Sequence, residues 1–209
     1  HASLRRLNTE TIDILMLHRP DPLMEPDEIN TAWRTLFDAG KVRQLAVSNM
    51  HAGQLRQLSA ALETPLVANQ LEMSLLKTDW VDADTCFNDD QGRVSLVWAD
   101  TLHHCQGSGI ALQAWGSLGK GWYSGAAPQD APPAVAATAA LVQQLAQAHG
   151  VAPESIVLAW LLKHPARIQP VVGTANPARI RACADAQRVQ LTRGQWYALY
   201  QSARGRELP

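Results

Sequence analysis

Residues 11–22 read TIDILMLHRPDP, an apolar run that stops at a histidine, an arginine and a proline-rich turn. The run at 12–17 is short and rich in β-forming residues, and Pro20 and Pro22 follow it, so the pattern predicts a central strand rather than a buried helix. His18 then stands at the carboxyl end of that strand, where α/β folds place binding and catalytic residues. A lone histidine at this place can also be no more than a polar residue that ends a strand. The rest of the chain decides between a functional and a purely structural role.

The composition is that of a globular protein, with 209 residues, a formal net charge of −1 and 18% charged residues. We expect one domain over residues 1–209, and the near-neutral charge argues against nucleic acid or a membrane as a partner. The three cysteines lack C-x-x-C spacing, so we predict free thiols in a reducing, cytoplasmic protein. We see neither a signal peptide nor an apolar run of about 20 residues that would span a membrane.

Four more strand-like runs follow, each succeeded by a helical pattern. The strands are predicted at 43–49, 65–73, 109–118 and 168–175, and the helices at 27–40, 51–62, 96–106, 135–150, 153–165, 177–187 and 191–204. Gly40 would stop the first of these helices, and Thr192 would cap the last. The stretch from 75 to 107 is less regular and includes a polar loop at 87–93, while the Gly/Ala/Pro-rich loop at 120–133 resembles a mobile lid. Apolar strands alternating with helices predict a parallel sheet covered by helices.

The kind of α/β fold follows from the strand ends. The chain contains neither G-x-G-x-x-G nor G-x-x-x-x-G-K-[ST], which a doubly wound nucleotide-binding sheet usually carries. Polar residues end the predicted strands throughout, which favours a (β/α) barrel. A complete barrel has eight strands on roughly 250 residues. We find five strands, so three are missing.

Five segments in register resemble the aldo-keto reductase family, and in particular its bacterial oxidoreductases. They are DILMLHRPD (13–21), GKVRQLAVSNM (40–50), NQLEMS (69–74), AWGSLGKG (114–121) and VVGTANPARI (171–180). The resemblance implies a (β/α)8 TIM barrel that binds NADPH at its C-terminal face and reduces aldehydes and ketones to alcohols. It also implies that this chain is the C-terminal portion of the barrel, beginning in the third helix and lacking the first three βα units.

His18 matches the histidine of the family's catalytic tetrad of Asp, Tyr, Lys and His. Its neutral imidazole would donate a hydrogen bond to the substrate carbonyl, while the tyrosine would be the general acid. The other three tetrad residues belong to the missing units, and Tyr123, Tyr197 and Tyr200 lie in loop or late helical contexts. We therefore expect the chain as given to be inactive alone. The alternative is a non-catalytic nicotinamide-nucleotide-binding barrel, like the family's channel-associated regulatory subunits.

The resemblance also implies the residues that bind the nicotinamide end of the cofactor. Ser48, Asn49 and Gln70 match residues that hydrogen-bond the nicotinamide carboxamide, a task for which amide side chains offer both a donor and an acceptor. Each is also a common turn-capping type. Trp115 matches an aromatic residue that stacks on the nicotinamide ring, although one of seven tryptophans can equally be a core residue. The adjoining cofactor-binding residues, toward the pyrophosphate, are Gly116, Ser117 and Leu118.

The last strand leads to the predicted phosphate end of the cofactor site. Asn176 is a good helix N-cap and Pro177 suits the first helical position, so a helix N-terminus would offer an anion site. Thr174 and Arg179 match the residues that hold the adenosine 2′-phosphate, which favours NADPH over NADH, and Gly173 lies in the same cofactor-binding segment.

No metal site is predicted. The adjacent residues His103 and His104 would point in different directions on a helix and could not easily grip one ion. The predicted partner is a small-molecule carbonyl substrate, and the oligomeric state is left open.

Overall fold

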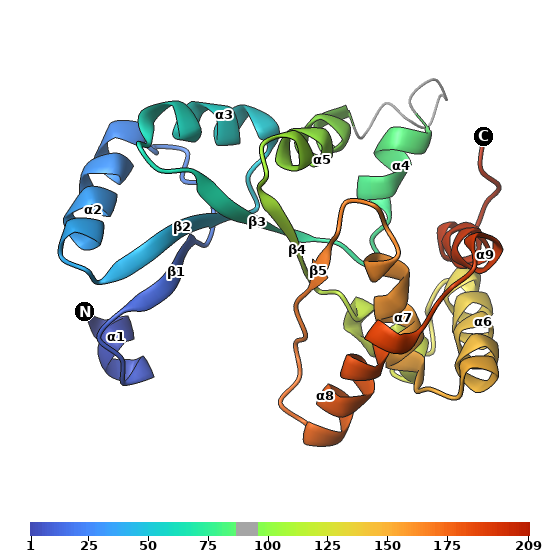
Figure 1. The fold of residues 1–209 in the computed structure, drawn as a ribbon. Helices are drawn as coiled ribbons and strands as arrows, with labels where there is room; N and C mark the ends of the chain where they lie inside the picture. The colour runs from blue at the N-terminus through green and yellow to red at the C-terminus, as the bar shows by residue number, and fades with distance from the viewer. Residues whose placement is uncertain (87–95) are drawn as a thin grey trace. The chain divides into compact units, whose positions relative to one another are not determined.

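The computed structural model describes residues 1–86 and 96–209, so the polar loop predicted at 87–93 lies outside the described residues. The chain divides into two compact units. The first unit is His1–Leu71 with Asp100–Ala111, and the second is Glu72–Ala99 with Leu112–Pro209. Strands and helices alternate along both units, which confirms the α/β class (Figure 1).

The first unit is built around parallel strands. Its elements are α1 (Ala2–Leu7), β1 (Ile12–Leu17), α2 (Pro26–Asp38), β2 (Val42–Ser48), α3 (Ala52–Ala61), β3 (Leu66–Glu72, whose last residue belongs to the second unit) and most of α5 (Leu96–Gly107). β2 pairs in parallel with β1 on one side and with β3 on the other. In this register Leu17 lies opposite Val47, and Ser48 lies opposite Gln70. The three strands therefore bring their carboxyl ends to the same edge.

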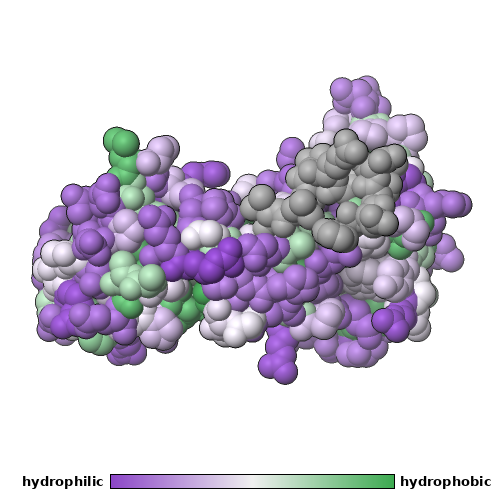
Figure 2. Space-filling model, turned by 90° about the horizontal axis from the view of Figure 1, so that it is seen from above, coloured by the Kyte–Doolittle hydropathy of each residue, from purple (hydrophilic) through white to green (hydrophobic). Residues whose placement is uncertain are grey.

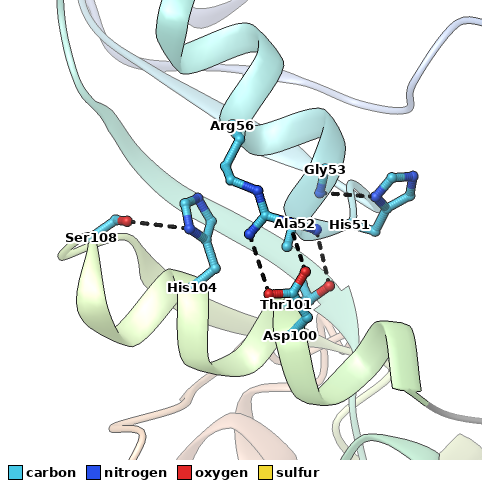
Figure 3. Close-up of polar contacts among 8 residues, drawn as sticks. All are labelled: His51, Ala52, Gly53, Arg56, Asp100, Thr101, His104 and Ser108. Carbon is cyan, nitrogen blue, oxygen red and sulfur yellow. Dashed lines mark hydrogen bonds and ion pairs between the residues drawn. The ribbon is translucent and has the colours of Figure 1, made fainter.

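Polar contacts fasten α5 to the first turn of α3 (Figure 3). The Thr101 hydroxyl accepts the Ala52 backbone N–H at 3.0 Å, which satisfies one of the unpaired donors at the start of the helix. Arg56 donates two hydrogen bonds to Asp100, at 3.2 and 2.7 Å, and these bonds lower the pKa of that carboxyl. His51 caps α3 by accepting the Gly53 N–H at 3.1 Å. These contacts hold the helices that flank the end of β2.

The second unit is mostly helical. It contains α4 (Asp79–Thr85), β4 (Ala111–Trp115, whose first residue belongs to the first unit), η2 (Gly119–Ser124), α6 (Pro133–His149), α7 (Pro153–Leu162), β5 (Gln169–Pro170), α8 (Pro177–Ala184), η3 (Asp185–Arg188) and α9 (Arg193–Arg204). β4 pairs in parallel with β5. α7 is the central element, because residues 155–161 are all buried and it packs against η2, α6, β5, α8 and η3.

An aromatic cluster joins α7, α9 and α4. The rings of Trp160 and Trp196 stack with centroids 5.2 Å apart, and each indole N–H donates to the other residue's carbonyl, at 3.2 and 2.9 Å. Trp80 meets Trp160 edge-on at 5.5 Å. The Tyr200 hydroxyl donates to the Asp82 carboxylate. Three of the seven tryptophans thus serve the core of the second unit.

Several predicted element boundaries are confirmed. α2 is followed by Gly40 in the left-handed conformation (φ 66°), and α9 begins after Thr192, whose hydroxyl accepts the Gln195 N–H at 3.1 Å. The three cysteines are buried and form no disulfide, as predicted. α1 confirms the predicted helix end at the start of the chain.

Other boundaries were wrong. α2 begins at Pro26 rather than Asp27, since a proline at the first helical position needs no hydrogen-bond acceptor for its nitrogen. The strand predicted at 168–175 is only Gln169–Pro170, because Pro170 lacks an N–H to continue the ladder; Val171 adds one bond, to the Ala114 carbonyl at 2.9 Å. The prediction also missed α4.

The start of the loop predicted to be a lid is packed instead. η2 occupies its first residues, and Tyr123 is only 3% exposed. Burial raises the pKa of Tyr123 to about 12. Its hydroxyl donates to the Leu75 carbonyl at 3.4 Å. This segment therefore belongs to the core of the second unit.

One face of the molecule shows how its surface residues are distributed. Hydrophilic residues cover most of the face seen in Figure 2, with hydrophobic residues in smaller patches. β1 is an exception to the rule that apolar strands are covered, since Ile14 remains 43% exposed. Among the described residues, no helix is both long and apolar enough to cross a membrane.

Candidate functional site

The carboxyl ends of β1, β2 and β3 bring four predicted site residues together in the first unit. The Ser48 hydroxyl donates to the Gln70 carbonyl at 2.8 Å, and the Asn49 backbone N–H donates to the same carbonyl at 3.0 Å. The Asn49 side-chain amide donates to Ser48 Oγ at 2.8 Å and to the His18 carbonyl at 3.3 Å. Asn49 thus ties three strand ends to one another, and we call these four residues the strand-end group.

Asn49 has a backbone conformation that few residues adopt. Its φ of 60° is left-handed, and asparagine is among the few side chains that tolerate this region because it can hydrogen-bond locally. The turn directs the chain from β2 into the His51 cap of α3. Position 49 therefore needs both the left-handed backbone and an amide donor.

The strand-end group differs in how much each side chain is exposed. Ser48 is 1% exposed and its hydroxyl bonds inside the protein, so it positions Asn49 rather than reaching a ligand. Asn49 and Gln70 are half-buried. The His18 side chain is exposed just after β1. Histidine and amide groups therefore lie where an approaching carbonyl or carboxamide could meet them.

The end of β4 carries the next predicted residues, in the second unit. Trp115 is half-buried, and its carbonyl accepts the Met73 N–H at 3.3 Å. Ser117 is 1% exposed and donates to the Val171 carbonyl at 2.8 Å, and Leu118 packs on the buried cluster of Leu158, Cys183 and Ala186. The side chains of these two residues thus secure the turn, and contact with a ligand would fall to Trp115 and the backbone.

The turn after β4 is a run of left-handed backbone. Gly116 has φ 65°, and Gly119, Lys120 and Gly121 follow with φ of 55°, 57° and 76°. A Cβ at Gly119 would lie 3.1 Å from the Cβ of Leu76, closer than side chains ordinarily pack. Glycine is therefore required at that position by both conformation and space.

The segment after β5 holds the predicted phosphate residues. Asn176 caps α8, since its Oδ1 accepts the N–H groups of Ala178 at 2.9 Å and Arg179 at 3.3 Å. Pro177 stands at the first helical position, as predicted. Because Asn176 already satisfies both backbone donors, the expected anion site would depend on the Arg179 side chain and the helix dipole. The Thr174 hydroxyl accepts the Asn176 N–H at 3.2 Å, which leaves its own proton to donate.

Arg179 has a partner that the sequence did not reveal. Its Nε lies 3.4 Å from Oε1 of Glu154, in the first turn of α7. The Glu154 side chain is 13% exposed and that of Arg179 is 42% exposed. A glutamate in a first helical turn is common for reasons of the helix dipole alone, so nothing in the sequence pattern pointed to this ion pair.

Gly173, by contrast, is not required to be glycine. It is exposed, its φ lies outside the left-handed region, and a Cβ there would meet no atom within 4 Å. A ligand could approach this backbone closely, which is consistent with its predicted place in the cofactor site.

None of the three tyrosines is suited to be the general acid. Tyr123 lies in η2, and Tyr197 and Tyr200 lie in α9, so none of them ends a strand. Burial raises the pKa of both Tyr123 and Tyr200, and the hydrogen bond to Asp82 raises that of Tyr200 further. A tyrosine that donates a proton efficiently near neutral pH needs its pKa lowered instead.

These features define a class: an α/β protein of parallel strands whose polar side chains gather at the strands' carboxyl ends, as in barrel enzymes. Residues 1–203 match the model of the aldo/keto reductase family, and the chain belongs to that family. The resemblance drawn from five sequence segments is thereby confirmed.

Named relatives agree with this assignment. The chain is 39% identical over 208 residues to a 6-dehydroglucose reductase of Agrobacterium fabrum and 35% identical over 207 residues to one of Novosphingobium aromaticivorans. It is 31% identical over 207 residues to the oxidoreductase YdhF of Escherichia coli. In each case 99% of this chain matches 62% of the relative, so the chain spans less than two thirds of the relatives' length.

Solved structures show the same fold over part of their length. The thermostable aldo-keto reductase Tm1743, crystallised with the inhibitor epalrestat, superposes with a TM-score of 0.75 at 21% identity, covering 96% of this chain and 63% of that one. The five strands therefore correspond to part of an aldo-keto reductase barrel fold. The roles of the individual site residues stay predictions.

Proposed function

We propose that the protein carrying these residues reduces aldehydes or ketones to alcohols with NADPH, and that residues 1–209 are the C-terminal portion of its barrel. The observation that carries the proposal is the strand-end group, in a chain that matches the family model over residues 1–203. Here a histidine lies beside two half-buried amide side chains. Such a set can orient a carbonyl and bind a carboxamide.

His18 would act on the substrate. A neutral imidazole can donate an N–H to the substrate's carbonyl oxygen, which fixes the carbonyl and stabilises the negative charge that develops on it. The exposed position of His18 after β1 leaves the ring accessible for this contact. NADPH, when bound, supplies the hydride, and the protein's task is to hold both partners in position.

Within each unit, the predicted cofactor residues suit a particular part of the nucleotide. Asn49 and Gln70 offer amides to the nicotinamide carboxamide, with Ser48 holding Asn49 in place. Trp115 offers an aromatic face to the nicotinamide ring. In the second unit, the Thr174 hydroxyl and the Arg179 guanidinium suit a 2′-phosphate, for which a planar fork of donors is well shaped. Gly116, which is exposed and has a φ of 65°, offers backbone without a side chain to the pyrophosphate.

The proton donor would come from outside these residues. The three tyrosines lie in helices, and burial raises the pKa of two of them. We therefore assign the Asp, Tyr and Lys of the tetrad to sequence that precedes His1 in the complete protein.

The substrate we propose is a sugar-like aldehyde. It rests on the two relatives named 6-dehydroglucose reductase, which match 99% of this chain. An aldehyde carried on a polyol ring would also need polar partners beside the carbonyl, which further loops of a complete barrel can supply.

The test is NADPH oxidation by the full-length gene product, assayed with 6-dehydroglucose and with simple aldehydes. We expect turnover, and we expect His18→Ala to lower kcat/KM by about a hundredfold or more because it removes the carbonyl donor. The control is His103→Ala, which alters an exposed histidine on α5. Tight NADPH binding without turnover on any carbonyl would instead favour the non-catalytic nucleotide-binding alternative.

A further inference from the structure

We propose that Glu154 is a specificity-determining residue that lowers the preference for NADPH over NADH by partly neutralising Arg179. The inference rests on the proposed function, since it takes Arg179 as the residue that faces the 2′-phosphate. Its direct basis is the ion pair between Arg179 Nε and Glu154 Oε1 at 3.4 Å. A 2′-phosphate that approaches Arg179 would meet a guanidinium already paired with a carboxylate.

The ion pair is held in place by the packing of α7 against α8. Ser155, which is fully buried next to Glu154, donates to the Ala182 carbonyl of α8 at 2.6 Å. Leu158 of α7 and Cys183 of α8 share a buried cluster. Glu154 and Arg179 both act on the pKa of the Cys183 thiol, which burial raises most, so both charges lie near that buried group. The backbones that carry Glu154 and Arg179 are therefore held next to each other by the packing of the two helices.

Glu154 is also fixed from its own helix. It stands in the first turn of α7, where the helix dipole favours a negative charge, and α7 has no side-chain cap that would compete for that end. Its side chain is 13% exposed, so water screens its charge less than it screens an exposed carboxylate. The helix dipole and the low exposure thus both favour a charged carboxylate beside Arg179.

The guanidinium of Arg179 has different neighbours at its two ends. Glu154 lies at Nε, whereas Nη2 lies 3.5 Å from where a Cβ at Gly121 would be. Arg179 is thus placed between the first turn of α7 and the glycine-containing turn after β4. The charge of Arg179 would attract a 2′-phosphate dianion, and the charge of Glu154 would repel the same phosphate. The uncharged 2′-hydroxyl of NADH would interact only weakly with either charge. The carboxylate therefore acts on NADPH selectively.

The Glu154→Gln variant removes the negative charge at residue 154 and keeps the size and shape of the side chain. The glutamine carbonyl can still accept from Arg179 Nε, but the negative charge is gone. We expect the dissociation constant of the full-length protein for NADPH to fall about threefold to fivefold at low salt, with NADH unchanged. This gain in NADPH affinity should be smaller at high salt, where the charges are screened. Adenosine 2′,5′-bisphosphate should show the same gain, while 5′-AMP should not.

The matched control is Asp185→Asn, which removes a charge from a neighbouring carboxylate that pairs with Arg188 at 3.0 Å. It changes the net charge equally and should leave NADPH affinity unchanged. Glu154→Ala serves as a second variant and should shift NADPH affinity in the same direction as Glu154→Gln. Binding is measured by calorimetry, so the readout does not depend on turnover.

The outcomes separate this inference from the proposed function. If Arg179→Gln weakens NADPH but both Glu154 variants leave its affinity unchanged or weaken it, the inference is overturned and the proposed function stands. If Arg179→Gln leaves NADPH affinity unchanged, the assignment of the 2′-phosphate residue fails, and this inference fails with it.

Discussion

The strand-end group of the first unit and the segment around Arg179 in the second unit are built differently. In the strand-end group, Ser48, Asn49 and the Gln70 carbonyl hydrogen-bond one another and the His18 backbone. Arg179, in contrast, extends from the first turn of α8 and pairs with Glu154 of α7. A substitution in the first group should therefore disturb the turn that joins three strand ends as well as binding, whereas a substitution at Arg179 should act on binding and on the ion pair with Glu154.

The two regions also differ in how deeply the neighbouring strands and helices are buried. The first unit includes β1, an apolar strand that remains partly exposed and pairs only with β2 in the described part of the chain. The second unit is organised around the fully buried α7 and its aromatic cluster. The strand-end group thus lies in the unit that contains the partly exposed strand β1.

The largest expected effect is on the 209-residue chain produced by itself. We expect no carbonyl reduction, because the chain offers no strand-end tyrosine as acid, and we expect the exposed apolar strand β1 to promote aggregation. Hydrogen exchange should be faster in β1 than in α7. The comparison is with the full-length gene product under the same conditions. Turnover by the short chain equal to that of the full-length protein would show that the assignment of the missing acid is wrong.

Asn49→Ala should cost stability as well as cofactor affinity. The variant loses two side-chain hydrogen bonds and places alanine at φ 60°, so we expect the free energy of unfolding to fall by about 2–3 kcal/mol. Asn49→Gly is the control, since glycine accepts the backbone conformation but restores neither hydrogen bond, and it should lose less. Urea unfolding of the full-length protein measures both. Equal losses in the two variants would mean that the backbone conformation contributes little.

Trp115 should report on the nicotinamide site through its fluorescence. NADPH should quench the tryptophan emission of the full-length protein, and Trp115→Ala should remove part of that quench, because the half-buried indole ends β4 where the ring would stack. Trp196→Phe, in the aromatic cluster of α7 and α9, is the control. A quench that survives unchanged in Trp115→Ala would make Trp115 a structural residue only.

The smallest expected effect is a pH dependence of the second unit. Burial lowers the pKa of His164, and nearby Asp84 only partly opposes this. Above the unfolded-state pKa of about 6.5 the histidine is neutral in both states, and as the pH falls below it the unfolded chain takes up a proton that the folded chain resists. Stability should therefore decline on acidification, and His164→Gln should flatten the decline. The urea midpoint at neutral and mildly acidic pH measures this, and an unchanged slope in the variant would exclude His164 as its source.

Local rules predicted the parts of the fold that local chemistry decides. Asn176 with Pro177, and Thr192, mark helix starts because their side chains act within three residues of themselves. α4 was missed because three aspartates make residues 79–85 look like a loop, and only the burial of Trp80 against Trp160 makes the helix favourable. Tertiary packing there overrides propensity.

In the candidate site, too, the sequence predicted local features but not the contacts that depend on long-range packing. The sequence placed Ser48, Asn49 and Gln70 at strand ends, but which of them bonds inside the protein depends on the register between β2 and β3. The Glu154–Arg179 pair joins residues 25 positions apart in sequence, so no local pattern contains it. Long-range pairs of this kind become visible only once the helices are packed.

The most direct test of the central claim, that these residues form part of an NADPH site, is cofactor titration of Arg179→Ala in the full-length protein. We predict that NADPH binding weakens by about 1.5–3 kcal/mol while NADH binding stays as in the unaltered protein, since the guanidinium acts on the 2′-phosphate that NADH lacks. Unchanged NADPH affinity, or an equal loss for both cofactors, would contradict the account.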